Sequence, residues 1–382
     1  MVKTGDKFYA KAADDVLQEK GECGGAVTAT LKYLLQNRVV DGVLAMGHGA
    51  DIYDGKPKFI TDPKRVTELS GSLRCAPILH ANVLRKYLNG AKDMRIAVVG
   101  VGCDCVALEK LGKKGVINVD NLILIGLNCG GMLPPVKAQE MIQKLFETDP
   151  TDVVNEEIAN GYFIIETTAH ERKELRIDDL EEMGWGRRAN CRRCEVKIPR
   201  MADLAFGKWG VTGPDSSTAT FVEVCSEAGA QLLGDAIVAG ALITEDPLPR
   251  GLEVRDHVEK AMLKLAAKWQ RHDFVTGDAK DEYWLAQFSK CIKCYGCIDA
   301  CPICACDNCK IECKEPLWIE SNELPPSPKF QFTRAAHMSD DCVNCGQCED
   351  ACPAEIPLST FFQQSSKEYA KLFARFDELT SM

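Results

Sequence analysis

A run of about 20 apolar residues, the length that crosses a bilayer as a helix, is missing from this 382-residue sequence. The first residues, MVKTGDKFYAKAADD, have no apolar stretch behind their lysines, which argues against a secretory signal. A basic excess is missing as well, since 46 Lys and Arg residues stand against 56 Asp and Glu, for a net charge of -10. That balance repels nucleic acid. We therefore expect a soluble, cytoplasmic protein without a membrane span, whose partners are proteins and small molecules and not nucleic acid.

Side-chain patterns of common catalytic sites are also missing. The 6 histidines show no metal-ligand spacing, and neither a Ser-His-Asp set nor a pair of catalytic carboxylates can be read. The segment GVGCDC has Cys105 where a dinucleotide fingerprint needs its third glycine, which argues against a nicotinamide site. No pattern suggests a pterin or nickel-iron centre. We therefore expect no catalytic side chain, and chemistry that belongs to cofactors positioned by the protein.

Cysteine, in contrast, is abundant, with 20 residues, and two runs share the pattern C-x₂-C-x₂-C-x₃-C-P: KCIKCYGCIDACP (290–302) and DCVNCGQCEDACP (341–353). In a reducing compartment such spacings indicate metal ligation and not disulfides. The pattern is typical of ferredoxins with two [4Fe-4S] clusters, in which the last cysteine of each run binds the other cluster. Two zinc sites are the alternative. The predicted ligand sets are Cys291, Cys294, Cys297 and Cys352 for one cluster, and Cys342, Cys345, Cys348 and Cys301 for the other.

A second group of cysteines lies in the N-terminal part. Cys103 follows the strand-like run RIAVVGV, Cys129 follows NLILIGLN, and Cys191 and Cys194 form CRRC. Because the carboxyl ends of parallel strands meet at one edge of a sheet, Cys103 and Cys129 could face the same crevice. The residues alone leave three possibilities open: a third cluster, a zinc site, or separately buried thiols.

Helical and strand-like patterns alternate between residues 20 and 250. The helical segment AVTATLKYLLQN (26–37) is followed by β-branched runs at 95–101, 121–126, 161–166 and 219–224, which predicts an α/β fold with a largely parallel sheet. We predict an N-terminal flavin-binding α/β domain (1–250), a helical connector (251–289) and a C-terminal two-cluster ferredoxin-like α+β domain (290–382) that ends in a helix near 358–379.

Several segments in the N-terminal part resemble one known family. CGGAVTATLKYLLQNRVVDGVLA (23–45), LILIGLNCGG (122–131) and ANCRRCEVKIPRMADLAFGKWG (189–210) are similar to the beta subunits of coenzyme F420 hydrogenases and dehydrogenases, and the resemblance extends over residues 20–245. It implies FAD beside one [4Fe-4S] cluster, with coenzyme F420 as substrate. In that family the ligands of this cluster map onto Cys103, Cys129, Cys191 and Cys194. The formate dehydrogenase members carry a C-terminal ferredoxin domain, as this chain does, whereas the hydrogenase members lack it.

The resemblance also implies contacts with the two flavin-type molecules. Small residues let backbone amides approach a pyrophosphate, with ordinary turn and packing roles as the alternative. Basic residues would meet the anionic tail of F420 or hold a positive field near the third cluster, with a solvated surface as the alternative. The chain departs from the family at Leu73, Arg74, Cys75 and Cys225. The predicted FAD contacts are Gly24, Gly25, Gly71 and Ser72, and the predicted F420 contacts are Arg187, Arg188, Arg192 and Arg193.

The expected function follows from what each cofactor carries. Iron-sulfur clusters pass single electrons, whereas F420 accepts a hydride. FAD would therefore collect single electrons from the clusters and transfer a hydride to F420 from flavin N5. The resemblance implies a molybdopterin or tungstopterin alpha subunit that oxidises formate. The alternatives are a subunit of a hydrogenase, an F420H2 dehydrogenase or a heterodisulfide reductase assembly, or a polyferredoxin-like carrier without flavin. For Cys304, Cys306, Cys309 and Cys313 the spacing matches no known site, and we expect no further cluster there.

Overall fold

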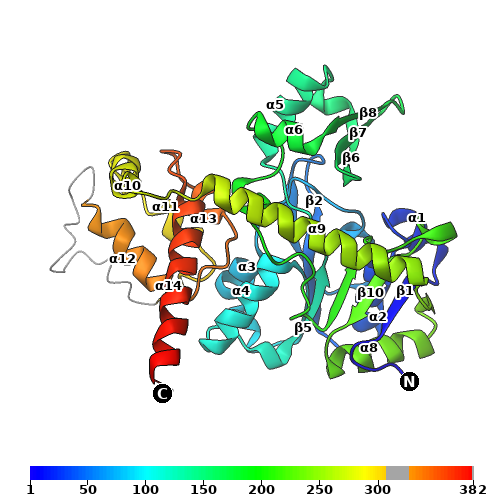
Figure 1. Ribbon diagram of the computed structural model, residues 1–382. Helices are drawn as coiled ribbons and strands as arrows, with labels where there is room; N and C mark the ends of the chain where they lie inside the picture. Colours follow the sequence, from blue (N-terminus) through cyan, green and yellow to red (C-terminus); the bar gives the residue numbers. More distant parts are fainter. Residues whose placement is uncertain (307–326, 381–382) are drawn as a thin grey trace. The chain divides into compact units, whose positions relative to one another are not determined.

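The computed structural model describes residues 1–306 and 327–380 of the chain (Figure 1). The chain forms two compact units. Unit 1 comprises Met1–Arg188 and Glu195–Lys264, and unit 2 comprises Ala189–Cys194 and Leu265–Met382. A short internal segment, 189–194, therefore belongs to the same unit as the C-terminal third of the chain.

Unit 1 is built on an eight-stranded mixed sheet. Its parallel part joins β2 to β4, β4 to β5, and β5 to β9, and the other four pairings are antiparallel. The expectation of an α/β fold is confirmed, but that of a largely parallel sheet is wrong. The strand order is β11 (Leu242–Glu245), β1 (Lys7–Ala12), β10 (Thr220–Val224), β9 (Leu204–Gly207), β5 (Leu122–Leu127), β4 (Ile96–Val101), β2 (Gly42–His48) and β3 (Gly55–Ile60).

Helices cover both faces of this sheet. Apolar residues at helical spacing place α2 (Ala26–Gln36) in one core cluster with α8 (Glu227–Val238) and with Ala97 and Val99 of β4. Ile96 and Val98 alternate with these two residues along β4 and point to the opposite face. On that side lie α3 (His80–Tyr87) and α4 (Gly102–Lys113) (Figure 1). The carboxyl ends of β4 and β5 consequently open at one edge, between the helical layers.

A smaller antiparallel sheet forms a separate layer of unit 1, with β6 (Val153–Ala159), β7 (Tyr162–Thr167) and β8 (Arg172–Arg176). Its core of Phe163, Ile165 and neighbours packs against α5 (Pro135–Leu145) and α6 (Ile177–Glu182) (Figure 1). The run at 161–166 is thus a strand as predicted, but it is not part of the main sheet. Asn160 and Gly161 join β6 to β7 with φ of 52° and 83°, which is the backbone of a tight hairpin turn.

Unit 2 consists of helices and loops, and no β-strand occurs in its described residues. The expected α+β character of the C-terminal domain is therefore not seen in these residues. Helices, and not strands, flank both cysteine loops. An aromatic cluster joins two of the helices, with the ring of Phe361 4.9 Å from Trp284 and 4.8 Å from Phe288. The helices are α7 (Ala189–Arg192), α10 (Lys280–Phe288), α11 (Gly296–Asp299), α12 (Lys329–His337), α13 (Gln347–Asp350) and α14 (Leu358–Thr380).

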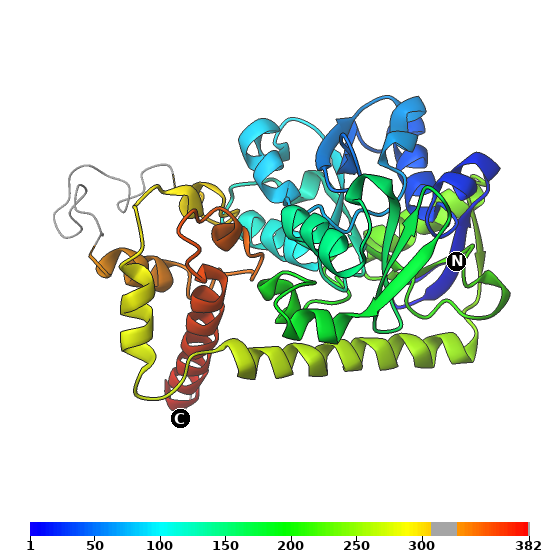
Figure 2. The ribbon, with the colours of Figure 1, turned by 90° about the horizontal axis from the view of Figure 1, so that it is seen from above.

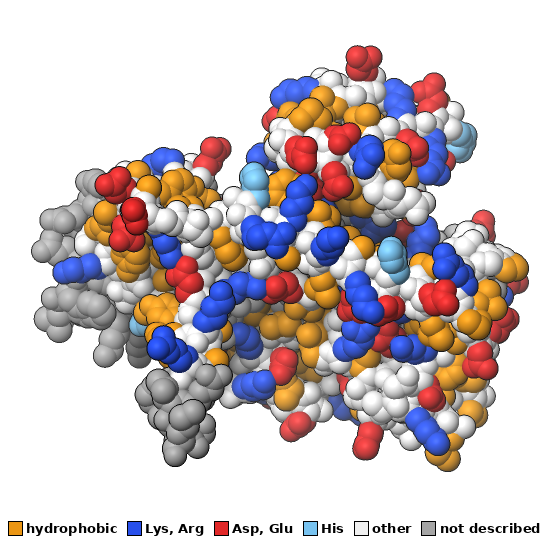
Figure 3. Space-filling model, in the orientation of Figure 1, with side chains coloured by type: hydrophobic (Ala, Val, Ile, Leu, Met, Phe, Trp, Pro, Cys, Tyr) orange, Lys and Arg blue, Asp and Glu red, His pale blue; other side chains and the backbone are white. Residues whose placement is uncertain are grey.

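The remaining helices are α1 (Asp15–Lys20), in unit 1, and α9 (Pro249–Asp273), which is one continuous helix (Figure 2). Five short 3₁₀ helices lie at Pro63–Leu69, Asn89–Ala91, Val119–Asn121, Pro150–Asp152 and Gly213–Asp215. None of the helices in the described residues combines the length and the apolar character that a bilayer crossing needs. Acidic and basic side chains are interspersed over the face drawn in Figure 3 and do not gather into a field of one sign.

Candidate functional site

The two cysteine runs of unit 2 fold alike. In each loop the residue before the second cysteine and the residue after it adopt the left-handed conformation: Lys293 and Tyr295 in the first (φ 54° and 60°), Asn344 and Gly346 in the second (φ 52° and 74°). A non-glycine residue rarely adopts this conformation, and such strain collects at functional sites. A short helix, α11 or α13, then carries the third cysteine and leads to the fourth.

A pocket in unit 2 brings the second loop together with the last cysteine of the first run. Its walls include Cys301, Pro302, Arg334 and Phe362 beside the second loop. Burial raises the pKa of Cys348 well above its ordinary value, and the neighbouring thiols Cys345 and Cys342 add to the shift. The cysteines that line this pocket are Cys301, Cys342, Cys345 and Cys348.

Cys297 is the buried member of the four cysteines of the two runs that do not line this pocket. Burial raises the pKa of this thiol, Arg334 lowers it, and the charges of Cys291, Cys352 and Cys294 raise it further. The exchange of the last cysteines between the two clusters stays a prediction of the motif, and the charge of Cys352 on Cys297 and the place of Cys301 in the pocket are in line with it. Among residues 1–306 and 327–380, no three His, Cys, Asp or Glu side chains are arranged around one metal ion.

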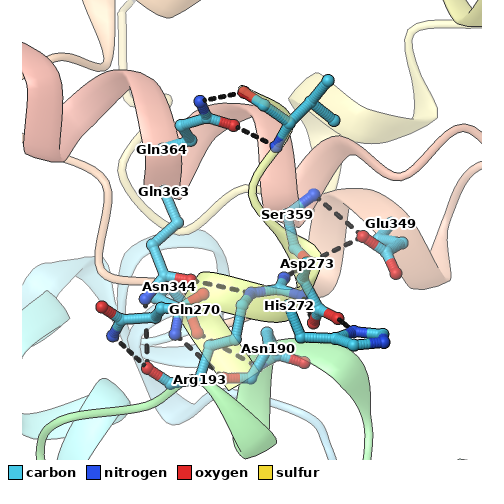
Figure 4. Close-up of polar contacts among 11 residues, drawn as sticks. Asn190, Arg193, Gln270, His272, Asp273, Asn344, Glu349, Ser359, Gln363 and Gln364 are labelled. Carbon is cyan, nitrogen blue, oxygen red and sulfur yellow. Dashed lines mark hydrogen bonds and ion pairs between the residues drawn. The ribbon is translucent and has the colours of Figure 1, made fainter. Parts of the chain in front are cut away.

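Segment 189–194 is held inside unit 2 by an extensive set of hydrogen bonds (Figure 4). Asn190 Nδ2 donates to Asn344 O at 3.0 Å, and Asn344 Nδ2 donates to Asn190 O at 2.9 Å. The Arg193 guanidinium, which is 1% exposed, donates to Asp273 at 2.6 Å, Ser359 at 2.8 Å and Gln363 at 2.9 Å. The CRRC segment is therefore attached directly to the second cysteine loop.

The carboxyl edge of β4 and β5 in unit 1 carries the other two cysteines of the predicted third set. Cys103 lies in the first turn of α4, and Cys129 lies two residues after β5. Cys129 N donates to Lys197 O at 3.0 Å, and a Cβ on Gly102 would stand 2.6 Å from Val196 O. The structure thus places Cys103 and Cys129 at the same sheet edge in unit 1, whereas Cys191 and Cys194 belong to unit 2.

The glycine pair predicted to contact FAD lies at the amino end of α2. Gly24 and Gly25 are both left-handed, with φ of 70° and 66°, and a Cβ on Gly24 would stand 2.0 Å from Thr218 O. Close packing therefore requires these glycines whatever else they do. No side chain caps α2, so its first N–H groups are available to an anion.

The second predicted FAD segment, Gly71–Ser72, lies beside the first. Ser70 Oγ is 3.4 Å from Thr28 Oγ1 in α2, and Arg74 Nη2 donates to Glu22 at 2.7 Å. Ser72 is exposed. The structure consequently brings the two predicted flavin-contact segments together around the start of α2.

The predicted F420-binding arginines do not form a solvated face, because most of them are buried. Arg187 is 4% exposed and donates to Glu181 at 2.5 Å and to Gly130 O at 2.9 Å. Arg188 is 5% exposed, and the guanidinium of Arg192 lies 4.1 Å from the Trp269 ring centre. With Arg193 bound in unit 2, at least Arg187 and Arg193 have structural roles, and a role in binding an anionic tail stays a prediction.

A buried carboxyl of unit 1, Glu156, was not indicated by the sequence patterns. It is 5% exposed and accepts from Cys75 Sγ at 3.5 Å, while its other oxygen has no partner. Burial raises the pKa of Glu156 to about 7, although Cys75 and Arg74 oppose the shift. Cys75 is one of the positions at which the chain departs from the family pattern.

Glu156 should make the stability of unit 1 depend on pH. The folded chain keeps a proton that the unfolded chain releases above its ordinary pKa of 4.5. The stabilisation is complete below pH 4.5 and should be lost as the pH rises to about 7, by at most about 3 kcal/mol. Thermal unfolding midpoints of wild type and Glu156→Gln, measured from pH 5 to 8, should therefore diverge in favour of the variant. Parallel profiles would contradict the prediction.

Other polar residues missed by the sequence reasoning are the buried pair His80 and Asp104. Asp104 accepts from His80 N, from Ala81 N and from His80 Nδ1, the last at 2.7 Å, and so caps α3. Asp104 is the acidic residue of GVGCDC, and Cys105 Sγ in the same motif lies 3.6 Å from Gly100 O. Asp104 and Cys105 of this motif therefore contribute to helix capping and packing. Cys304 lies 3.9 Å from Met338, while Cys309 and Cys313 are outside the described residues.

In comparisons with protein-family descriptions and with known proteins, most of the chain matches. Residues 7–85 and 93–249 match the N-terminal and C-terminal parts of the family described as coenzyme F420 hydrogenase/dehydrogenase, beta subunit, and residues 336–357 match a 4Fe-4S binding domain. The beta subunit of F420-dependent formate dehydrogenase from Methanocaldococcus jannaschii is 46% identical, over 93% of this chain and 91% of its own length. That of formate dehydrogenase 1 from Methanococcus maripaludis is 47% identical, over 96% and 93%.

More distant similarities cover only part of the chain. The coenzyme F420 hydrogenase beta subunit of Methanococcus voltae is 24% identical over 68% of this chain and 90% of its own length. A chain of the F420-reducing [NiFe] hydrogenase complex from Methanosarcina barkeri has a similar structure, with a TM-score of 0.62 and 17% identity over 73% of this chain and 96% of that one. This structural likeness supports the mixed α/β fold.

Proposed function

Because this chain belongs to the coenzyme F420 hydrogenase/dehydrogenase beta-subunit family, we propose that it is the beta subunit of an F420-dependent formate dehydrogenase that binds iron-sulfur clusters. As an oxidoreductase subunit it would work with a molybdopterin or tungstopterin alpha subunit, on which formate is oxidised. Coenzyme F420 would be its own substrate.

The observation that carries the proposal is the extent of the similarity. The formate dehydrogenase beta subunits match over more than nine-tenths of this chain, cysteine loops of unit 2 included. The match to the hydrogenase beta subunit from Methanococcus voltae includes 90% of that subunit but only 68% of this chain. The additional C-terminal part thus favours formate dehydrogenase over hydrogenase.

The cysteine groups support three [4Fe-4S] clusters. In unit 2 we assign one cluster to Cys291, Cys294, Cys297 and Cys352 and a second to the pocket cysteines Cys301, Cys342, Cys345 and Cys348. The third is assigned to Cys103, Cys129, Cys191 and Cys194 from the family resemblance. Cys103 and Cys129 share a sheet edge, and the CRRC segment is bonded to the second cysteine loop through Asn190 and Asn344.

The start of α2 fits a flavin pyrophosphate. Uncapped N–H groups of α2, the left-handed Gly24 and Gly25, and the adjacent Gly71–Ser72 segment offer backbone donors without bulky side chains. FAD, when bound, supplies the exchange between single electrons from the clusters and a hydride for F420. The protein's contribution is to hold the cofactors in sequence.

The proposal is tested by the cofactor content of the purified chain. Denaturation of iron-replete protein by acid or heat should release a yellow, fluorescent flavin, about one per chain, that chromatography identifies as FAD. Iron and acid-labile sulfide are measured on the same sample to show that it is fully loaded. A colourless supernatant from loaded protein would leave an electron carrier and remove the flavoenzyme assignment.

A further inference from the structure

Helix α12 directs two polar side chains toward the first cysteine loop. Arg334 Nη1 donates to Cys297 Sγ at 3.0 Å, and Arg334 Nη2 donates to Cys297 O at 3.1 Å. One turn earlier, Gln331 Nε2 lies 3.9 Å from Cys291 Sγ. Both side chains are nearly inaccessible to solvent, at 2% and 1% exposure. A single helix face therefore reaches two thiols of one cysteine group.

The same arginine also lines the pocket that holds the other cysteine group. Cys301 and Cys348 line this pocket together with Arg334. The face of the guanidinium rests on the ring of Phe362, 4.7 Å from the ring centre. Arg334 thus donates to a cysteine of the first group and lines the pocket of the second.

This guanidinium has no carboxylate as a counter-charge. Among the described residues no Asp or Glu forms an ion pair with Arg334, and its Nε has no hydrogen-bond partner. A buried cation without an anion is costly. Cysteine sulfurs lie near the guanidinium, and thiolates bound to an iron-sulfur cluster carry, with it, a net negative charge that grows when the cluster accepts an electron.

A positive charge close to a cluster stabilises the reduced form more than the oxidised form, because the reduced form is more negative. A hydrogen bond from a guanidinium to a ligand sulfur acts in the same direction. In a buried site, both effects are stronger than they would be in water.

We propose that Arg334 is a positioning residue for electron transfer. It raises the reduction potentials of both clusters of unit 2, and it raises the potential of the Cys297 cluster more. The proposal rests on the assignment of two clusters to unit 2. The direct hydrogen bond from Arg334 to Cys297 Sγ accounts for the larger effect on the cluster that Cys297 binds. Because one guanidinium acts on both clusters, it stabilises an electron on either of them.

The test is a redox titration of the iron-replete full chain, followed by electron paramagnetic resonance, for wild type, Arg334→Gln and Arg334→Lys. Arg334→Gln should lower both midpoint potentials, and Arg334→Lys, which keeps the charge and loses the planar fork, should lower them less. Repeating Arg334→Gln in a Cys345→Ser background, which retains the Cys297 cluster, and in a Cys294→Ser background, which retains the other, assigns each shift to its cluster.

Arg271→Gln is the matched control, because Arg271 is an exposed arginine of the same unit. It should leave both potentials unchanged. Equal shifts in Arg271→Gln and Arg334→Gln, or unchanged potentials in Arg334→Gln with normal iron content, would overturn the proposal. If Arg334→Gln does not assemble its clusters, unchanged potentials in Arg334→Lys would overturn it equally. Wild-type protein without clusters in unit 2 would instead contradict the proposed function itself.

Discussion

The double variant Cys345→Ser/Cys352→Ser should lose both clusters of unit 2, whereas Cys297→Ser/Cys352→Ser should lose only one. The charge of Cys352 acts on Cys297, and Cys301 lines the pocket with Cys345. If each cysteine binds the cluster next to it, Cys345 and Cys352 serve different clusters and Cys297 and Cys352 serve the same one. Loss of a thiolate ligand releases or degrades a cluster because the bond contributes to folding around the metal.

Iron and acid-labile sulfide, measured per chain after reconstitution, distinguish the two arrangements. Each lost cluster removes about four iron atoms. The control is Cys191→Ser, which should spare both clusters of unit 2 and affect only the third. If each run instead held its own cluster, Cys345→Ser/Cys352→Ser would lose one cluster and Cys297→Ser/Cys352→Ser would lose two, which is the reverse of the expected result.

The isolated, cluster-loaded chain should reduce a viologen dye with reduced F420 as donor and should be at least about 100-fold slower, in kcat/KM, with NADH. A nicotinamide dinucleotide would need the amino end of α4, but Cys105 replaces the third glycine of the fingerprint. Gly102 at that end is packed against Val196, and Asp104 is used to cap α3. The deazaflavin selectivity therefore follows from the absence of a nicotinamide site as well as from the family.

Steady-state rates with the two donors, at equal concentrations and with the same preparation, provide the measurement. Formate and hydrogen serve as negative controls, because no pterin or nickel-iron pattern occurs in the sequence and neither should reduce the dye without a partner subunit. Turnover with NADH that equals or exceeds turnover with F420 would overturn the substrate assignment even if FAD and all three clusters were present.

Local patterns in the sequence identified strands more successfully than their pairing. The runs at 95–101, 121–126, 161–166 and 219–224 all contain strands. Their direction depends on which strands become neighbours, and β10 pairs with the N-terminal strand β1, whose alternation KFYAKA was not recognised. One missed signal was local: Asn160-Gly161 between two strand-like runs predicts a tight antiparallel hairpin.

The cysteine grouping remains a prediction from spacing: three cysteines in one tight loop cannot surround a cluster, so the fourth must come from elsewhere. Arg334 could not be found this way, since it follows Cys297 by 37 residues on a helix of ordinary amphipathic pattern. The burial of Arg193 was equally unpredictable. Its partner Asp273 is 80 residues away in sequence, and an arginine is exposed in most proteins.

The split composition of unit 2 has a consequence for the order of folding. Segment 189–194 leaves the ribosome well before its partners, since Ser359 and Gln363 follow Arg193 by 166 and 170 residues. The intervening chain, 195–264, belongs to unit 1. The sheet of unit 1 can therefore form before the hydrogen-bond partners of Arg193 in α14 have been synthesised. Closing so long a loop is slow, and residues 265–382 produced as a fragment would lack the arginine that fills their interior. The hydrogen bonds of Arg193 to Ser359 and Gln363 can therefore form only after the last helix, α14, has been synthesised.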